Sequence, residues 1–92
     1  MANVVVTLNI MPVSPSIELE KVESEAKRYI SEFAGLLNSK TEIVPIAFGL
    51  KAVKIIFVMD EDKGSTEILE ENIAKINGVN SVEVLDVRRT IG

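Results

Sequence analysis

The sequence contains neither cysteine nor histidine. Without these residues the chain cannot form a disulfide, a thiolate or imidazole zinc site, a cysteine nucleophile or a Ser-His-Asp triad. Phosphate-binding glycine motifs are also missing, because the residues around Gly49 and Gly64 match neither G-x-x-x-x-G-K-[ST] nor G-x-G-x-x-G. We therefore expect no metal site, no cofactor and no enzyme activity.

Aromatic residues are scarce, at 4% of the 92 residues, whereas hydrophobic residues of all kinds make up 47%. Val, Ile and Leu must therefore supply most of the buried surface, as in an aliphatic core. A chain of this length forms one domain, here residues 1–92, because its halves would be too small to fold alone. The four aromatic residues are Tyr29, Phe33, Phe48 and Phe57.

Positive charge is also in short supply. The 14 acidic and 10 basic residues give a net charge of -4, which opposes binding to phosphate backbones, so we expect no direct contact with nucleic acid. The apolar runs are short, and the N-terminus lacks the basic stretch and apolar core of a signal peptide. These features predict a cytoplasmic protein that binds no membrane.

The first third of the chain has the pattern of a strand followed by a helix. Residues 4–11 place Val and Ile at alternate positions, as in a strand, and prolines from Pro12 onward end it. Ser16 is the expected N-cap of the helix, and apolar residues then recur at steps of three and four. Gly35 lies near the expected end of this helix.

The rest of the chain predicts three more strands and a second helix. Two extended segments within residues 41–59 flank the sequence PIAFG, and the second of them is the stronger strand. Ser65 is the expected N-cap of the second helix, which the dipeptide at 77–78 closes. A last strand covers residues 79–88.

The element order βαββαβ predicts an α+β fold, a ferredoxin-like sandwich with a four-stranded antiparallel sheet and two helices on one face. In this topology the first and third strands are central. The sequence agrees, because Pro45 and Glu83 fall on the expected edge strands. The last strand changes phase between Val84 and Leu85, which indicates a β-bulge or partial cover on both faces.

Two charged groups are candidate sites. Asp60, Glu61 and Asp62 could hold a hard cation, but they lack EF-hand spacing, and a solvated turn is the favoured explanation. Arg88 and Arg89 are adjacent on the last strand and should point to opposite faces. They serve either solubility and edge protection or the binding of an anionic partner surface, and the residues alone leave both alternatives open.

The segment 44–50 is the most informative part of the chain. Pro45 fixes one backbone angle, Gly49 permits unusual ones, and the bulky Phe48 lies between them. Taken alone, the residues favour packing of Phe48 into the sheet. The alternative is that Phe48 is an exposed interface anchor, since a few aromatic or arginine residues usually dominate binding energy.

The sequences EIVPIAFGLKAVKIIFVMDED and STEILEENIAKINGVNSVEVLDVRR resemble the archaeal elongation factor 1-beta proteins, which are similar to the exchange domain of the eukaryotic factor. The resemblance covers essentially the whole chain, and PIAFGL is its most specific part. It implies the same βαββαβ fold and guanine nucleotide exchange, in which the protein binds elongation factor 1-alpha with GDP and promotes its exchange for GTP. The factor can then bind aminoacyl-tRNA again.

The resemblance also implies a partner-binding site. Residues Pro45, Ile46, Ala47, Phe48 and Gly49 match the family's loop that contacts the GTPase, with Phe48 as the projecting aromatic residue. The eukaryotic relatives have a lysine near the C-terminus that is thought to disturb the magnesium site of the GTPase. This chain has no lysine there, so either Arg88 or Arg89 replaces it or exchange proceeds without a cation.

Two other functions fit the same fold. An RNA-binding sheet would need stacking aromatic residues and basic charge on its open face, and the sequence has neither the RNP1 pattern nor a positive net charge. A small-molecule-sensing or self-associating regulatory domain is the main alternative to nucleotide exchange.

Overall fold

The strands and helices follow one another along the chain in the predicted order βαββαβ. The computed structural model describes residues 3–35 and 39–90. Within these ranges neither helix has the length and apolar character that crossing a bilayer requires. The elements are β1 (Asn3–Pro12), α1 (Leu19–Ala34), β2 (Ser39–Pro45), the 3-10 turn η1 (Ala47–Gly49), β3 (Lys51–Asp60), the 3-10 turn η2 (Glu61–Lys63), α2 (Glu67–Ala74) and β4 (Val79–Thr90).

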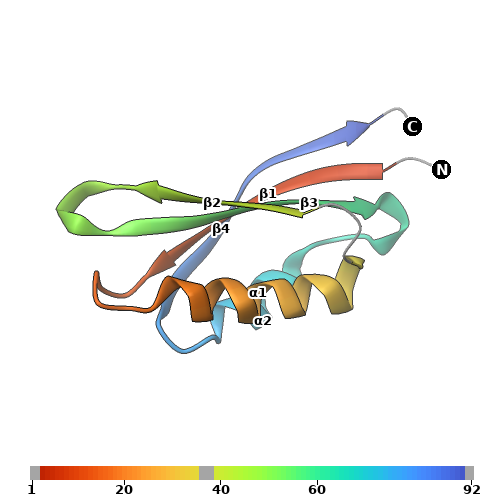
Figure 1. Ribbon diagram of the computed structural model, residues 1–92. Coiled ribbons are helices and arrows are strands. Elements are labelled where there is room, and N and C mark those ends of the chain that lie inside the picture. The colour runs from red at the N-terminus through yellow and green to blue at the C-terminus, as the bar shows by residue number, and fades with distance from the viewer. Residues whose placement is uncertain (1–2, 36–38, 91–92) are drawn as a thin grey trace.

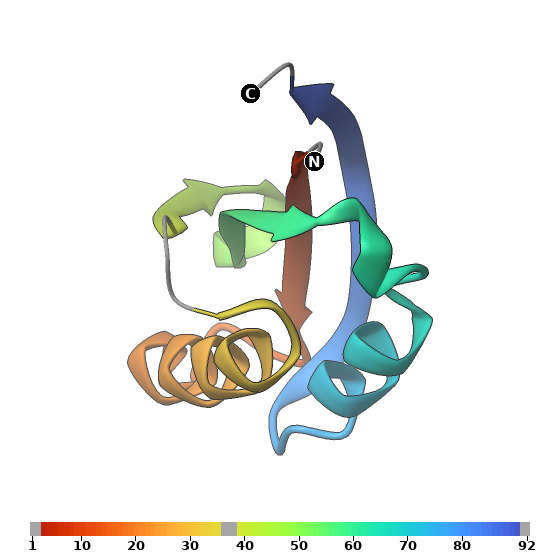
Figure 2. The same ribbon diagram turned by 90° about the vertical axis from the view of Figure 1, so that its right-hand side faces the viewer.

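The four strands form one antiparallel sheet in the order β2-β3-β1-β4. Both helices lie on the same side of this sheet (Figures 1 and 2). The α+β ferredoxin-like fold is therefore confirmed, with β1 and β3 in the centre and β2 and β4 at the edges. The molecule is elongated, measuring 42 × 21 × 18 Å.

The β-bulge predicted in the last strand is present. Thr7 pairs with Asp86 and the next residue of β1, Leu8, pairs with Val84, so Leu85 has no partner across the ladder. Such an extra residue shifts the alternation of the strand by one position. As a result, Val84 and Val87, rather than residues two apart, face the same side as the buried residues of β1.

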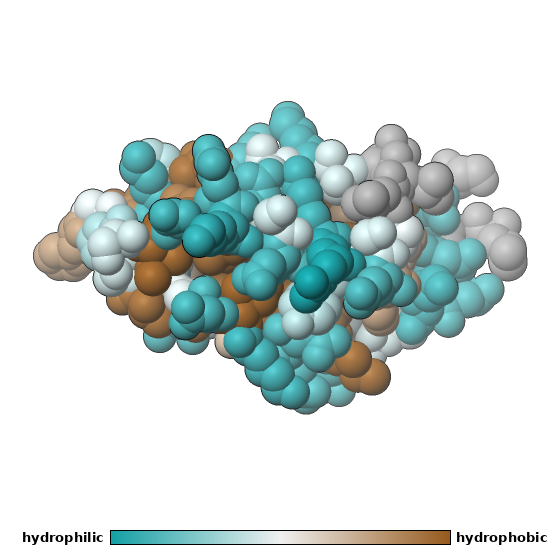
Figure 3. All heavy atoms as spheres, turned by 60° about the horizontal axis from the view of Figure 1, so that its bottom comes forward, coloured by the Kyte–Doolittle hydropathy of each residue, from teal (hydrophilic) through white to brown (hydrophobic). Residues whose placement is uncertain are grey.

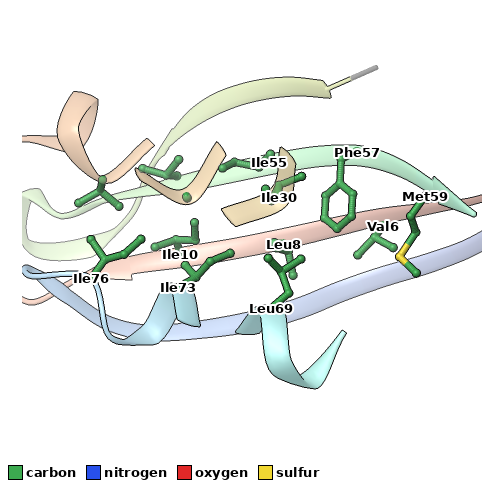
Figure 4. Packing of buried hydrophobic residues seen from close by; sticks show 13 residues of the cluster. Val6, Leu8, Ile10, Ile30, Ile55, Phe57, Met59, Leu69, Ile73 and Ile76 are labelled. Atoms are coloured by element: carbon green, nitrogen blue, oxygen red, sulfur yellow. The ribbon is translucent and has the colours of Figure 1, made fainter. Parts of the chain in front are cut away.

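The core lies between the sheet and the two helices, and it is almost entirely aliphatic (Figure 4). Phe57 is its only fully buried aromatic residue among those described. Alternate residues of β1 and β3 supply one side, and the inner stripes of the helices supply the other. The buried cluster consists of Val6, Leu8, Ile10, Val22, Ala26, Ile30, Val53, Ile55, Phe57, Met59, Leu69, Ile73 and Ile76.

The predicted start of the first helix is wrong. Helix α1 begins at Leu19, and Ser16 is not its N-cap. Instead, the amide of Ser16 donates to Ser14 Oγ at 3.3 Å, and the two hydroxyl groups lie 2.9 Å apart. These serines therefore stabilise a turn before the helix. The predicted end is confirmed, because Gly35 follows the last helical residue and its amide donates to the Ser31 carbonyl.

The limits of the second helix also differ from the prediction. Ser65 Oγ does accept a hydrogen bond from the Glu67 amide at 3.1 Å, although Thr66 is the residue directly before the helix. Helix α2 ends at Ala74, before the predicted 77–78 dipeptide. The chain continues in tight turns there, in which the Ile76 amide donates to the Ile73 carbonyl at 3.0 Å.

Neighbouring isoleucines on opposite faces of β3 test which side of the sheet holds the core. Ile55 is fully buried beneath the helices, whereas Ile56 is half-buried on the open face. We expect Ile55→Ala to lower the free energy of unfolding by about 2–5 kcal/mol, because it leaves a cavity, and Ile56→Ala to cost less than half as much. Urea unfolding followed by circular dichroism measures both, and equal losses would contradict this division.

Candidate functional site

The β2–β3 hairpin ends in a short loop, residues 46–50, which we call the tip loop. Pro45 and Lys51 form the last pair of the ladder below it. Across the loop, the Ile46 amide donates to the Leu50 carbonyl at 2.8 Å, and the Leu50 amide donates to the Ala47 carbonyl at 3.2 Å. The turn η1 is therefore closed by its own backbone and is supported directly by two paired strands.

Phe48 has the left-handed backbone conformation, with φ 62° and ψ 30°. It is the only residue other than glycine with a positive φ in the described part of the chain. This conformation costs a residue with a Cβ atom roughly 1–2 kcal/mol. Gly49 continues the turn with φ 76°, so two consecutive left-handed residues reverse the chain.

The side chain of Phe48 is 95% exposed. The packing of Phe48 into the sheet, which the residues alone favoured, is therefore wrong. The physical reason is the turn itself: the ladder ends at Pro45 and Lys51, and the left-handed turn places Phe48 beyond both strands. The alternative conformation, an exposed aromatic side chain on a rigid loop, is the one observed.

Other hydrophobic side chains are exposed near Phe48. Ile43, Val44 and Ile46 are 44%, 36% and 37% exposed. Figure 3 shows hydrophobic atoms at the hairpin end of the molecule, and teal atoms over most of the centre of the same face. The hairpin end therefore exposes one aromatic and three aliphatic side chains, although Ile43 and Val44, as neighbours in β2, point to opposite faces of the sheet.

The predicted site residues fall into two separate groups. Residues 45–49 are together at the hairpin end, and all of them are exposed. Arg88 and Arg89 pair with Val5 and Val4, near the start of β1, and this region lies at the other end of the molecule (Figure 1). The 10-residue strand β3 runs between the two ends, a span of about 30 Å.

The two arginines point to opposite faces of the sheet, as predicted. Arg89 lies opposite Val4, which packs on the core side, and Arg88 lies opposite Val5 on the open face. Each has an acidic partner. Arg88 Nε lies 2.7 Å from Asp86 Oδ2, whereas Arg89 Nε and Nη2 lie 2.9 and 2.7 Å from Glu61 Oε2.

The sequence did not identify Glu61 as the partner of Arg89, because 28 residues separate the two and no local pattern links them. The acidic run that contains Glu61 is a structured turn. Asp60 Oδ1 accepts a hydrogen bond from the Asp62 amide at 2.9 Å, which begins η2. Across residues 3–35 and 39–90, no three acidic side chains are grouped as metal ligands would be.

The fold and the site define a class of protein. The molecule is a small α+β sandwich whose distinctive feature is an exposed hydrophobic side chain held on a rigid hairpin, which is the form of a domain that acts by binding another macromolecule. Comparison with known proteins identifies the family. Residues 5–90 match the family model described as the EF-1 guanine nucleotide exchange domain.

Curated relatives agree with this match over nearly their whole length. The chain is 42% identical to the elongation factor 1-beta of Methanothermobacter thermautotrophicus over 89 residues, which is 97% of this chain and 98% of that protein. It is 43% identical to the elongation factor 1-beta of Methanobrevibacter smithii and 39% identical to that of Staphylothermus marinus, with the same coverage. The chain therefore belongs to the EF-1 guanine nucleotide exchange domain family, whose curated members named here are elongation factors.

A solved structure shares the fold. It is LarC2, the C-terminal domain of a cyclometallase involved in the synthesis of the NPN cofactor of lactate racemase, in the apo form. The TM-score is 0.64 at 10% sequence identity, and the match covers 99% of this chain and 58% of that chain. This likeness concerns the fold alone. None of these comparisons favours the alternative of a sensing or self-associating regulatory domain.

The conformation of Phe48 leads to a prediction about stability. Asn adopts the left-handed region more readily than Phe, and the exposed ring contributes no burial that would be lost. We expect Phe48→Asn to leave the free energy of unfolding unchanged or to raise it by up to about 1 kcal/mol. The matched control is the buried Phe57, for which Phe57→Ala should cost about 3–5 kcal/mol. A large loss for Phe48→Asn in urea unfolding would show that the ring supports the fold.

Proposed function

We propose that this protein promotes the exchange of GDP for GTP on elongation factor 1-alpha, in its GDP-bound form, by contact between protein surfaces. Family membership supports the general activity, and the exposed Phe48 supports the mechanism. No bond is made or broken by this chain, and it needs no cofactor. It works in the cytoplasm, without binding nucleic acid or a membrane.

The proposed mechanism is thermodynamic coupling. If this protein weakens the binding of GDP to the GTPase by a given factor, GDP must weaken the binding of this protein by the same factor. The protein must therefore bind best to the conformation of the GTPase in which the nucleotide is loosely held. A thousandfold faster release of GDP corresponds to about 4 kcal/mol in the barrier.

The single observation that carries the proposal is Phe48. An aromatic side chain that is 95% exposed gains nothing from the fold, and its backbone conformation costs stability. Such costs persist where the residue has a function. When a partner buries this ring, the burial contributes free energy to binding. Anchors of this kind contribute about 2–4 kcal/mol.

In the proposed site, Pro45, Ile46, Ala47 and Gly49 set the position of Phe48 and surround it with a complementary surface. The second proposed contact is the opposite end of the sheet, with Arg88 and Arg89. Because the two ends are about 30 Å apart, one compact segment of the GTPase cannot contact both. The interface must therefore extend along the molecule or consist of two separate parts.

Truncation of the aromatic ring tests the proposal. We expect the Phe48→Ala variant to fold normally. GDP release in its presence should be at least about tenfold slower than with the unmodified protein, because the anchor is lost. The measurement is the release of fluorescent GDP from loaded elongation factor 1-alpha at saturating free GTP. The control is Ile68→Ala, which removes an aliphatic side chain that is 67% exposed on α2. Unchanged release with Phe48→Ala would reject the proposed mechanism.

A further inference from the structure

The tip loop receives little support from the core of the protein. None of residues 46–50 is buried, and the ladder below the loop ends at Pro45 and Lys51. One other segment lies near it, the β1–α1 loop, which consists of residues 13–18. Figure 1 shows the orange β1–α1 loop and the tip of the β2–β3 hairpin at the same end of the molecule. The position of the tip loop therefore depends on the hairpin itself and on this neighbour.

The β1–α1 loop is fixed by its own hydrogen bonds. The Ile17 amide donates to the Ser14 carbonyl at 3.4 Å, which closes a turn with Pro15 at its second position. Proline suits this position because its ring already holds the φ angle that the turn requires. The Ser16 amide donates to Ser14 Oγ at 3.3 Å, so a second hydrogen bond stabilises the same turn.

Ile17 and Val13 attach the β1–α1 loop to the turn between α2 and β4. The Val13 amide donates to the Gly78 carbonyl at 2.9 Å. A Cβ atom added at Gly78 would lie 2.9 Å from Ile17 Cγ2, which is closer than real Cβ atoms approach other atoms. Ile17 also packs against the buried cluster. The loop therefore cannot move independently of the α2–β4 turn and the core.

Pro15 connects this fixed loop to the tip loop. A hollow of about 440 Å³ is lined by Pro12 and Ser14 on the one segment and by Gly49 on the other. A Cβ atom added at Gly49 would lie 4.0 Å from Pro15 Cγ. Within the described part of the chain, no other heavy atom beyond the neighbouring residues comes as close to that position. The ring of Pro15 is therefore the side chain that lies behind Gly49, the residue next to Phe48.

We propose that Pro15 and Ile17 are positioning residues that hold the tip loop in the orientation in which Phe48 binds. Ile17 ties the β1–α1 loop to the core, and Pro15 limits the movement of Gly49 toward that loop. A tip loop that is already in place loses less conformational entropy on binding, so the partner binds more tightly. This inference rests on the proposed function for its effect on exchange, but not for its effect on the free protein.

The first test compares Pro15→Ala with Pro15→Val. Both variants lose the fixed φ of proline, but only valine keeps a Cγ atom that can reach Gly49. We expect Pro15→Ala to lower the backbone order parameters of residues 46–50, measured by ¹⁵N relaxation of the free protein, by at least about 0.1 from the value of about 0.85 that rigid backbone shows. Pro15→Val should retain most of the order.

The same pair of variants should differ in exchange activity. The measurement is the concentration of this protein at which the release of fluorescent GDP from elongation factor 1-alpha is half-maximal. We expect Pro15→Ala to raise this concentration by at least about threefold, because the tip loop must then be ordered during binding. Pro15→Val should raise it by less.

The second test displaces the β1–α1 loop from a distance. Gly78→Ala forces Ile17 to move, whereas Gly35→Ala adds the same side chain at a glycine with a similar φ, 83° against 96°, and with no heavy atom within 4 Å. Both variants strain the backbone, so their difference isolates the contact with Ile17. We expect only Gly78→Ala to lower the order parameters of residues 46–50. Circular dichroism checks that both variants fold, and the Pro15 variants test the proposal if Gly78→Ala does not.

The outcomes separate this inference from the proposed function. Adding Pro15→Ala to Phe48→Ala should cause no further loss of exchange, because Pro15 acts through Phe48. An additive loss would show that the β1–α1 loop contacts the GTPase directly, and unchanged order parameters with Pro15→Ala would show that Pro15 does not hold the tip loop. Either result would overturn the positioning role. Lower order parameters with Pro15→Ala, together with unchanged GDP release with Phe48→Ala, would support the contact but count against the proposed function.

Discussion

The pairing of β1 with two neighbours is the constraint on which the rest of the structure depends. β1 lies between β3 and β4, antiparallel to both, with Val6, Leu8 and Ile10 beneath the helices. A slip of one residue in either ladder would turn these side chains to the open face, so their burial fixes the register. The same register fixes the two ends of the molecule, because it places the β2–β3 hairpin beyond one end of β1 and the end of β4 at the other.

Most of the fold could be predicted from the sequence, because alternation and helical periodicity report burial directly. The bulge at Leu85 is a good example, since the phase change in β4 is visible without a structure. Helix limits were less predictable. Ser16 fits the pattern of an N-cap, but its amide donates to Ser14 Oγ in a turn before the helix. A choice between competing local hydrogen bonds does not change the spacing of apolar residues, so the sequence pattern does not reveal it.

The candidate site was predictable in composition but not in geometry. Proline and glycine around Phe48 indicated an unusual turn, yet the exposure of the ring depends on where the ladder stops and on two left-handed residues in succession. The contact between Arg89 and Glu61 depends on the meeting of β4 and η2, which are distant in the sequence. Long-range contacts of this kind follow from topology and register, and a single sequence shows neither at the level of side chains.

The few aromatic residues of this chain have different places in the fold. An aliphatic core needs little aromatic surface, and Phe57 is buried within it. Phe48 is instead held outside by a turn that disfavours it, while the rigid ladder behind it gives the ring a fixed position and direction. A flexible loop would have to be ordered at the moment of binding, which costs about 1–2 kcal/mol per residue for the backbone. The strained turn has a smaller cost in free energy, and it is present already in the free protein. Under the proposed function, more of the binding energy therefore remains to favour the GTPase conformation that holds the nucleotide loosely.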